Sequence, residues 1–178
     1  MIKVLFFLLG CSSQLVWAER YGTSTVQASF KVIPEQRTER DEFGNLTTAF
    51  LSIESLGSRK SIIYGFAQTD IAERNRSTDF LHGWPERYLK GKNELKSGLY
   101  YKAVGIQKLS ERETLMRYSS LGLDSEAQNA IEPGFGLCKA NRVSEDIFVQ
   151  IMMECYGITR KDCERRHVEF LSGLRVEK

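Results

Sequence analysis

Residues 143–163 read VSEDIFVQIMMECYGITRKDC, and this stretch decides the fold that we predict from the sequence. Its apolar side chains recur at helical spacing, at Ile147, Ile151 and Cys155. Ser144 precedes them as an N-cap residue, and Gly157 is typical of the position just beyond the last turn of a helix. The pattern therefore predicts a helix over residues 145–156.

A second helix is predicted to begin almost at once. Thr159 can cap its first turn, and Asp162 suits the positive end of the helix dipole. The residues on its inward stripe are Cys163, Phe170 and Leu174. Gly173 marks the end of the stripe. Two helices joined by so short a turn form a helical hairpin.

The segment before this hairpin also favours a helix. Ser110 and Glu113 fit a capping box, in which the hydroxyl caps the first turn and the glutamate reaches back. We expect this helix to begin near residue 109 and to end near Gly122.

The first half of the chain has the patterns of strands. Residues 23–33 alternate apolar and polar side chains, which puts one set on a buried face: Val26, Ala28, Phe30 and Val32. A charged stretch follows, and residues 43–45 (Phe-Gly-Asn) predict a chain reversal. Residues 46–55 and 61–68 then predict two more strands, and residues 98–104 a fourth.

These elements predict the α+β class, with an N-terminal antiparallel β-meander followed by a C-terminal helical region that ends in a helical hairpin. We expect residues 19–178 to form a single α+β domain, strand-rich over 22–105 and helix-rich over 106–178. A division into two domains near residue 105 is the alternative.

The first 18 residues predict an export signal. Lys3 precedes the apolar run 4–9, and Ala18 is a small residue suited to a cleavage site. We therefore expect a periplasmic or secreted protein. Leu8-Leu9-Gly10-Cys11 also resembles a bacterial lipobox, so lipidation at Cys11 and an outer-membrane lipoprotein form the alternative.

The charge balance indicates what the protein does not bind. The chain has 25 basic and 23 acidic residues, and loss of residues 1–18 removes Lys3 and no acidic residue. The mature chain is then nearly neutral, which argues against nucleic acid as a partner. The hairpin around Gly157 has the outline of a DNA-reading helix-turn-helix, but an exported protein has no duplex to read.

Three cysteines remain after export, namely Cys138, Cys155 and Cys163. An oxidising compartment favours a disulfide, with one thiol left over. A bridge from Cys155 to Cys163 would staple the hairpin, whereas a bridge involving Cys138 closes a longer loop and is slightly favoured for that reason. A zinc site that adds His167 to the three cysteines is a further alternative, although the spacing lacks paired Cys-x-x-Cys motifs.

The functional hypothesis rests partly on motifs that the sequence lacks. It has no Gly-x-Ser-x-Gly, no His-Glu-x-x-His, no phosphate-binding glycine loop and no Cys-x-x-Cys. We assign no catalytic, cofactor-binding or metal-binding residue and predict no cofactor. We expect an exported, non-enzymatic protein-binding or accessory protein of the cell envelope, such as an inhibitor or immunity factor, whose partner is another envelope or secreted protein.

Two other functions remain open. A small exported hydrolase or metal-dependent enzyme would use His82 or His167. A small-ligand binder would use Trp84 together with Tyr100 and Tyr101, and His82 and Trp84 are candidates for a ligand or partner loop. The triplets at Asn45 and Asn75 fit the glycosylation pattern and are expected in turns or loops.

Overall fold

The structure is a computed structural model that describes residues 20–77, 79–94, 98–122 and 134–177. Strands make up 53% of these residues and helices 19%, so the protein is mostly β. This finding contradicts the predicted α+β class, because the expected helical region consists largely of strands. The signal peptide 1–18 and Cys11 lie outside the described residues.

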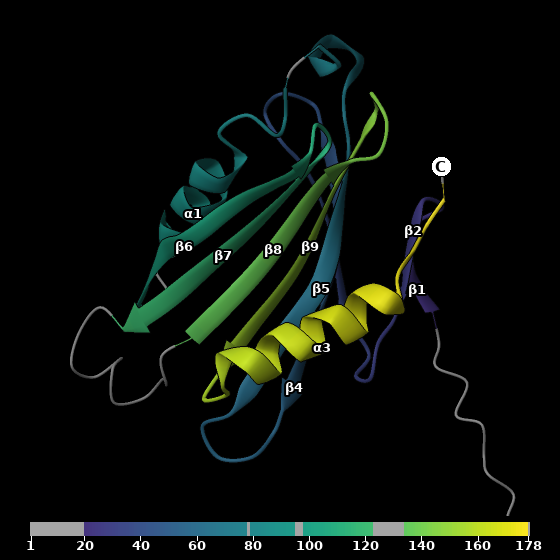
Figure 1. Cartoon of the computed structure of the whole chain (residues 1–178). Helices are drawn as coiled ribbons and strands as arrows, with labels where there is room; N and C mark the ends of the chain where they lie inside the picture. The colour runs from purple at the N-terminus through teal and green to yellow at the C-terminus, as the bar shows by residue number, and fades with distance from the viewer. Residues whose placement is uncertain (1–19, 78, 95–97, 123–133, 178) are drawn as a thin grey trace, which may run out of the picture.

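The main feature is a curved, fully antiparallel sheet of seven strands in the order β3-β4-β5-β9-β8-β7-β6 (Figure 1). Its strands are β3 (Glu35–Arg40), β4 (Leu46–Ser55), β5 (Ser61–Asp70), β6 (Leu99–Ser110), β7 (Glu113–Gly122), β8 (Gly134–Arg142) and β9 (Ile147–Tyr156). Two meanders, β3–β5 and β6–β9, join where β5 pairs with β9 over their whole lengths. The sheet is therefore continuous across both halves of the chain.

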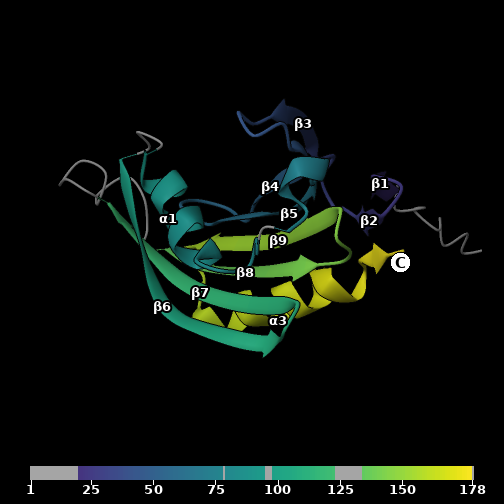
Figure 2. The same cartoon turned by 90° about the horizontal axis from the view of Figure 1, so that it is seen from above.

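A three-stranded sheet lies beside the large one and brings the two ends of the described chain together. Its members are β1 (Arg20–Gly22), β2 (Val26–Ser29) and β10 (Arg175–Val176). The described helices are α1 (Trp84–Glu94), α3 (Arg160–Ser172) and the short 3-10 helix η1 (Glu73–Asn75). Figure 2 shows α1 and α3 on opposite faces of the large sheet. No helix in the described part of the chain is long and apolar enough to cross a membrane.

The core is split by the sheet into two clusters. Under α3, buried side chains include Phe30, Phe66, Ile151, Met153 and Phe170. Under α1, they include Trp84, Tyr101, Met116, Tyr118 and Phe148. Because both faces are covered, the central strands bury side chains in both directions.

The helix predicted over residues 145–156 is wrong, because this segment is β9, in the middle of the sheet. Phe148 and Glu154 face α1, whereas Val149 and Ile151 face α3. A strand that is buried on both faces shows a continuous apolar run, which periodicity cannot distinguish from a buried helix.

The predicted role of Gly157 as a helix terminator also fails, since the chain turns there out of a strand. Gly157 has φ of +64°, and a Cβ at this position would lie 2.6 Å from the carbonyl oxygen of Arg59. The turn therefore requires glycine for its backbone dihedral angle and for the close approach of a neighbouring loop.

The helix expected from residue 109 to Gly122 is a β-hairpin instead. Ser110 and Glu113 lie at its turn, where the hydroxyl accepts a hydrogen bond of 3.2 Å from the Arg112 N–H. β7 then buries alternate side chains, at Thr114, Met116, Tyr118 and Ser120. The helical hairpin is thus absent, and α3 alone remains of it within the described residues.

Several local predictions are confirmed. The strands predicted at 46–55 and 61–68 correspond to β4 and β5, and Gly44 forms the expected reversal with φ of +82°. Thr159 caps α3 by accepting a hydrogen bond of 3.2 Å from the Asp162 N–H, and α3 ends at Gly173. The expected strand 23–33 is shorter, because regular pairing covers Val26–Ser29 in β2.

Two elements were missed by the sequence reasoning. The charged stretch after Ile33 is β3, an edge strand whose six residues are all exposed. Charged side chains on an edge strand discourage pairing with other chains. The charges of this stretch, which did not suggest a strand in the sequence, therefore suit its position at the edge of the sheet. The segment taken for a loop around Trp84 is the beginning of α1, with Pro85 in the first turn, where its missing N–H has no cost.

Candidate functional site

The disulfide joins Cys155 at the end of β9 to Cys163 in the first turn of α3, with a Cα–Cα distance of 5.9 Å. Cys138 is free and buried, and it belongs to the cluster under α1. The slight preference for a bridge involving Cys138 is therefore wrong, because the sheet separates its thiol from the other two. The zinc alternative with His167 fails for the same reason, and the described residues contain no group of three candidate metal ligands.

The two histidines are far from forming one site. His82 is exposed in the turn before α1, while His167 is buried on α3, on the opposite face of the sheet. Trp84 is a core residue with 3% exposure, and its ring packs on Tyr88 with 5.6 Å between ring centroids. Of the two adjacent tyrosines, Tyr101 is also buried and Tyr100 is exposed. Trp84 and Tyr101 are therefore core residues, and His82 and Tyr100 are the exposed members of this set.

A buried carboxylate lies beneath α1 instead. Glu154 is 2% exposed, and its Oε1 pairs with the ammonium group of Lys92 from α1. The Tyr118 hydroxyl donates to the same oxygen at 2.5 Å, and the Tyr156 hydroxyl donates to Oε2 at 3.0 Å. The Lys92 ammonium also lies 4.5 Å from the centroid of the Tyr101 ring. Both carboxylate oxygens therefore have partners.

The surroundings keep these tyrosines protonated. Burial, aided by nearby Tyr88 and Glu154, holds the pKa of Tyr118 well above its usual value. Burial and the Glu154 carboxylate likewise raise the pKa of Tyr156. Both phenols consequently act as hydrogen-bond donors to the carboxylate at neutral pH. The cluster is a closed network that ties α1 to the sheet.

A second buried polar group lies beneath α3. The His167 Nε2 has no hydrogen-bond partner among the described residues. Burial, together with the charges of Lys139 and Arg117, lowers the pKa of His167 to about 4. Each cation has its own acid, since Arg117 lies 3.6 Å from Glu164 and Lys139 lies 3.1 Å from Glu113. His167 is therefore neutral at pH 7.

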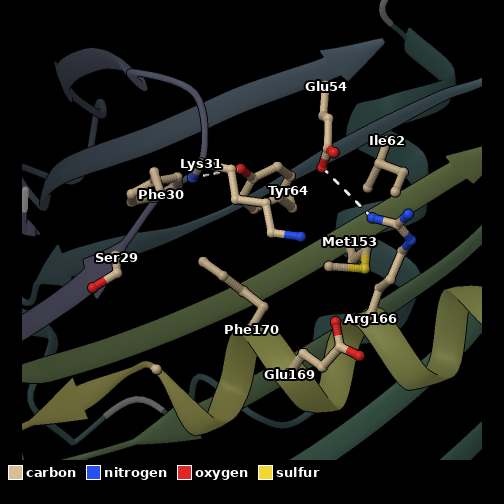
Figure 3. Close-up of a pocket in the computed structure, with 11 residues that line it drawn as sticks. Ser29, Phe30, Lys31, Glu54, Ile62, Tyr64, Met153, Arg166, Glu169 and Phe170 are labelled. Carbon is tan, nitrogen blue, oxygen red and sulfur yellow. Dashed lines mark hydrogen bonds and ion pairs between the residues drawn. The ribbon is translucent and has the colours of Figure 1, made fainter. Parts of the chain in front are cut away.

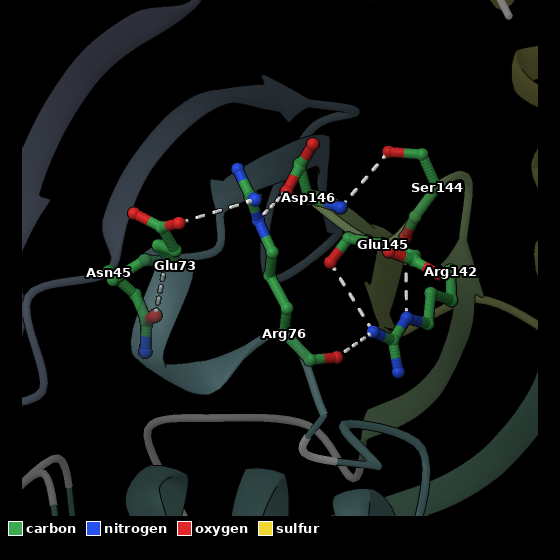
Figure 4. Close-up of polar contacts among 8 residues, drawn as sticks. Asn45, Glu73, Arg76, Arg142, Ser144, Glu145 and Asp146 are labelled. Atoms are coloured by element: carbon green, nitrogen blue, oxygen red, sulfur yellow. Dashed lines mark hydrogen bonds and ion pairs between the residues drawn. The ribbon is translucent and has the colours of Figure 1, made fainter.

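The β8–β9 turn is held to η1 by a network of arginine contacts (Figure 4). Arg142 donates to the carbonyl oxygens of Arg76 and Glu145, and Arg76 forms an ion pair with Asp146. These contacts join the segment after η1 to the β8–β9 turn. Both guanidinium groups therefore already have oxygen partners within the protein.

The asparagine side chains of both glycosylation triplets form hydrogen bonds within the protein. Asn45 is 4% exposed, and its amide donates to Asp41 at 2.8 Å while its Oδ1 accepts from the Ala72 N–H at 2.9 Å. The Asn75 amide donates to the Phe43 carbonyl oxygen at 3.0 Å. In the folded protein these amides hold neighbouring loops together.

A groove of about 490 Å³ with a mostly apolar lining lies between α3 and the start of the β2–β3 connection, and we call it the α3 groove (Figure 3). Its apolar lining comprises Phe30, Ile62, Tyr64, Met153 and Phe170. Its charged lining residues are Lys31, Glu54, Arg166 and Glu169. The volume is within the range of roughly 300–1,000 Å³ that is common for small-molecule sites.

Three aromatic rings from distant parts of the chain form one wall of the α3 groove. The Phe170 ring from α3 lies 5.5 Å from the Phe30 ring and 5.2 Å from the Tyr64 ring, between centroids. The Tyr64 hydroxyl accepts a hydrogen bond of 3.1 Å from the Lys31 N–H, which fixes the backbone at the groove edge. The groove is thus part of the packed structure rather than a gap between mobile side chains.

A scan of the sequence against known protein families gives no match, and a search of the curated proteins gives none either. The case for function therefore rests on the site itself. The sequence pattern places Phe30 and Phe170 on buried faces, but it contains no signal that Lys31, Glu54 or Arg166 surround the same cavity.

Proposed function

We propose that this chain is a non-enzymatic binding protein of an oxidising compartment, and that the α3 groove binds the apolar part of its ligand. The observation that carries the proposal is the combination of size and lining. The groove offers aromatic and aliphatic side chains beside a small set of charged groups. A concave, mostly apolar cavity with a few polar groups is the usual form of a small-molecule site.

The buried carboxylate is a weaker candidate for the functional site. Glu154 is nearly inaccessible, and its two oxygens are occupied by Lys92 and two tyrosines. A general acid or base must come within hydrogen-bond distance of its substrate. The α3 groove, on the opposite face of the sheet, has open volume next to its side chains. Binding is therefore better supported than catalysis.

The proposed compartment rests on two observations of different kinds. The sequence begins with the pattern of an export signal. The Cys155–Cys163 pair has the geometry of a disulfide, which persists in oxidising compartments. Release as a free protein and attachment through a lipid at Cys11 are both compatible with this proposal.

The test uses a neutral apolar dye, Nile red, because its binding does not depend on a charged group. We expect saturable binding of one dye per mature chain, residues 19–178. Gly173→Phe should weaken that binding at least tenfold. Gly173 lines the groove with a φ of −85°, and an added Cβ meets its nearest atom at an ordinary 3.6 Å, so the fold accommodates the change.

The matched control is Gly91→Phe in α1, outside the groove, where an added Cβ would have no atom within 4 Å. This variant should bind Nile red like the wild type. Absence of saturable binding, or equal binding by Gly173→Phe and the wild type, would contradict the proposal. Circular dichroism of both variants checks that they are folded.

A second function, binding of another protein, is favoured by the β6 edge of the sheet. β6 has several exposed apolar side chains, among them Tyr100, Val104 and Ile106. Its charges are Lys102 and Lys108, without an acidic residue in the strand. An extended partner segment with apolar and acidic side chains could add to this edge as a further strand.

Crosslinking in an extract of the source compartment tests this second function. A stoichiometric partner should be captured by the wild type and lost with Ile106→Lys, while Ile53→Lys on β4 is the matched control at another exposed isoleucine. Capture that persists in Ile106→Lys would place the partner elsewhere than on β6.

A further inference from the structure

The charged residues that line the α3 groove form ion pairs, with one exception. Glu54 forms an ion pair with Arg166, with 3.7 Å between the charged atoms. Glu169 pairs with Arg165, one turn earlier on α3, at 3.1 Å, and Arg165 also pairs with Asp162 at 3.3 Å. Among the residues that the structure describes, the Lys31 ammonium group forms no ion pair. Lys31 is therefore the charged lining residue that has no ion-pair partner, in a lining whose two cations and two acids balance.

The position of Lys31 makes this charge available to a ligand in the groove. Its backbone N–H is held by the Tyr64 hydroxyl at 3.1 Å, and its side chain extends into the space between Tyr64 and Phe170 (Figure 3). Lys31 is an exposed residue, so its ammonium group is accessible to a ligand at the edge of the apolar wall. An anion bound there would form an ion pair that is accessible to solvent, so its contribution to affinity is modest.

We infer that the ligand of the α3 groove is a small amphiphile with a single anionic group, of the long-chain carboxylate class, and that Lys31 binds its carboxylate. This inference rests on the proposed function and adds the chemistry of the ligand to it. The apolar chain lies along Ile62, Met153 and Phe170, which are all buried and uncharged.

The other charged residues of the groove disfavour different head groups. A dianionic ligand would find one free cation and would bring its second charge toward Glu54 or Glu169. A cationic amphiphile would lie near the positive charge of Lys31. It would find no unpaired carboxylate in the groove lining, since Glu54 and Glu169 are both paired with arginines. Like-charge contact at the groove would weaken its binding.

The experiment compares three amphiphiles that share one chain and differ in the head group: dodecanoate, dodecanol and dodecyltrimethylammonium. Each displaces Nile red from the mature protein below its micelle-forming concentration. We expect dodecanoate to displace the dye at about fivefold lower concentration than dodecanol, a ratio that corresponds to about 1 kcal/mol for one exposed ion pair. The trimethylammonium compound should bind most weakly.

Variants at Lys31 provide the decisive comparison. Lys31→Gln should bring dodecanoate and dodecanol to equal affinity, and Lys31→Glu should reverse the order in favour of the cation. Lys161→Gln is the matched control, because Lys161 is exposed on α3 and does not line the groove. It should retain the preference of the wild type for the carboxylate.

Different results would contradict the anionic-ligand inference and the proposed function. Nile red binding with no preference among the three amphiphiles, or a carboxylate preference that survives Lys31→Gln, would overturn the anionic-ligand inference and leave the groove as a binding site. Absence of Nile red binding and of binding by each amphiphile would overturn the proposed function itself.

Discussion

Cys155 and Cys163 connect the central strand of the sheet to the helix that forms one side of the α3 groove, with their Cα atoms 5.9 Å apart. Asp162, the residue before Cys163, donates its backbone N–H to the Thr159 hydroxyl at the N-cap. The cap and the disulfide therefore hold the same turn. The rest of α3 packs through Phe170 onto Phe30 and Tyr64. The groove wall is therefore fixed at both ends of the helix.

Loss of this disulfide should lower the stability of the fold. The closed loop spans a sequence separation of eight residues, for which the chain-entropy model gives about 2.5 kcal/mol. Urea unfolding of the double variant Cys155→Ala/Cys163→Ala should show a decrease of this size. Dithiothreitol should destabilise the wild type but not the variant. Equal sensitivity of both proteins to dithiothreitol would contradict the assignment of the disulfide.

The remaining thiol should be unreactive in the folded protein. Cys138 is fully buried, and burial raises the pKa of its thiol, so little thiolate forms at neutral pH. Iodoacetamide without reductant should leave the native mature chain unlabelled and add one group, on Cys138, after denaturation. Denaturation after reduction should give three labels. A label on Cys155 or Cys163 in the unreduced sample would be inconsistent with the pairing.

The Lys92–Glu154 pair should contribute strongly to stability because its members are shielded from water. Their side chains are 17% and 3% exposed. Lys92→Met leaves the carboxylate buried without its cation, which costs about 3–5 kcal/mol. The matched control is Lys90→Met in the same helix, whose pair with Glu94 is exposed and worth less than about 1 kcal/mol.

A double-variant cycle in urea separates the pair from its surroundings. Glu154→Gln combined with Lys92→Met should be less destabilising than the sum of the two single changes, because each single change leaves an unpaired buried partner. Additive effects would indicate that the two side chains do not interact in solution.

His167 should make the fold less stable in acid. Its pKa in the folded state is about 4, below the usual histidine value of 6.5, so the unfolded chain takes up a proton at higher pH than the folded chain. The stability from this group is fully present above pH 6.5 and is lost as the pH falls toward 4. The loss amounts to roughly 3 kcal/mol.

Urea unfolding at several pH values measures this linkage. His167→Gln should reduce the pH dependence between 6.5 and 4 by about one proton, although the variant is less stable overall. His82→Gln, at an exposed position, should keep the dependence of the wild type. An unchanged slope in His167→Gln would show that the imidazole is not buried in its neutral form.

The parts of the fold that were predicted correctly depend on local signals. Thr159 and Asp162 define the start of α3 through a contact three residues apart, and Gly44 requires a reversal by its own backbone preference. β4 and β5 were recognisable because they are bounded by turn residues. Such features do not depend on the rest of the chain.

The parts that were predicted wrongly depend on distant contacts. Ile147, Ile151 and Cys155 suit one stripe of a helix and equally one face of a strand that is covered on both sides. The pairing with β5 decides between a helix and a strand, and it joins residues of β9 to residues that lie 77 to 95 positions earlier in the sequence. Helix caps at Ser144 and Gly157 were plausible locally and were overridden by this pairing.

The disulfide pairing and the α3 groove also depend on distant contacts rather than on local signals. Loop entropy favoured a bridge involving Cys138, but the side-chain direction along β8 places that thiol on the other face of the sheet. Phe30 and Phe170 were each expected to be buried, yet their meeting with Tyr64 requires three segments to come together. The ion pair between Glu54 and Arg166 near Lys31 likewise requires β4 and α3 to come together.

The most direct test of the α3 groove is paramagnetic broadening of methyl signals by a spin-labelled long-chain carboxylate. We expect selective broadening of the methyl signals of Ile62 and Met153, which line the groove, with Ile106 on β6 unaffected. Broadening should disappear when unlabelled dodecanoate is added in excess. Broadening centred on Ile106, or uniform broadening across the protein, would contradict the account.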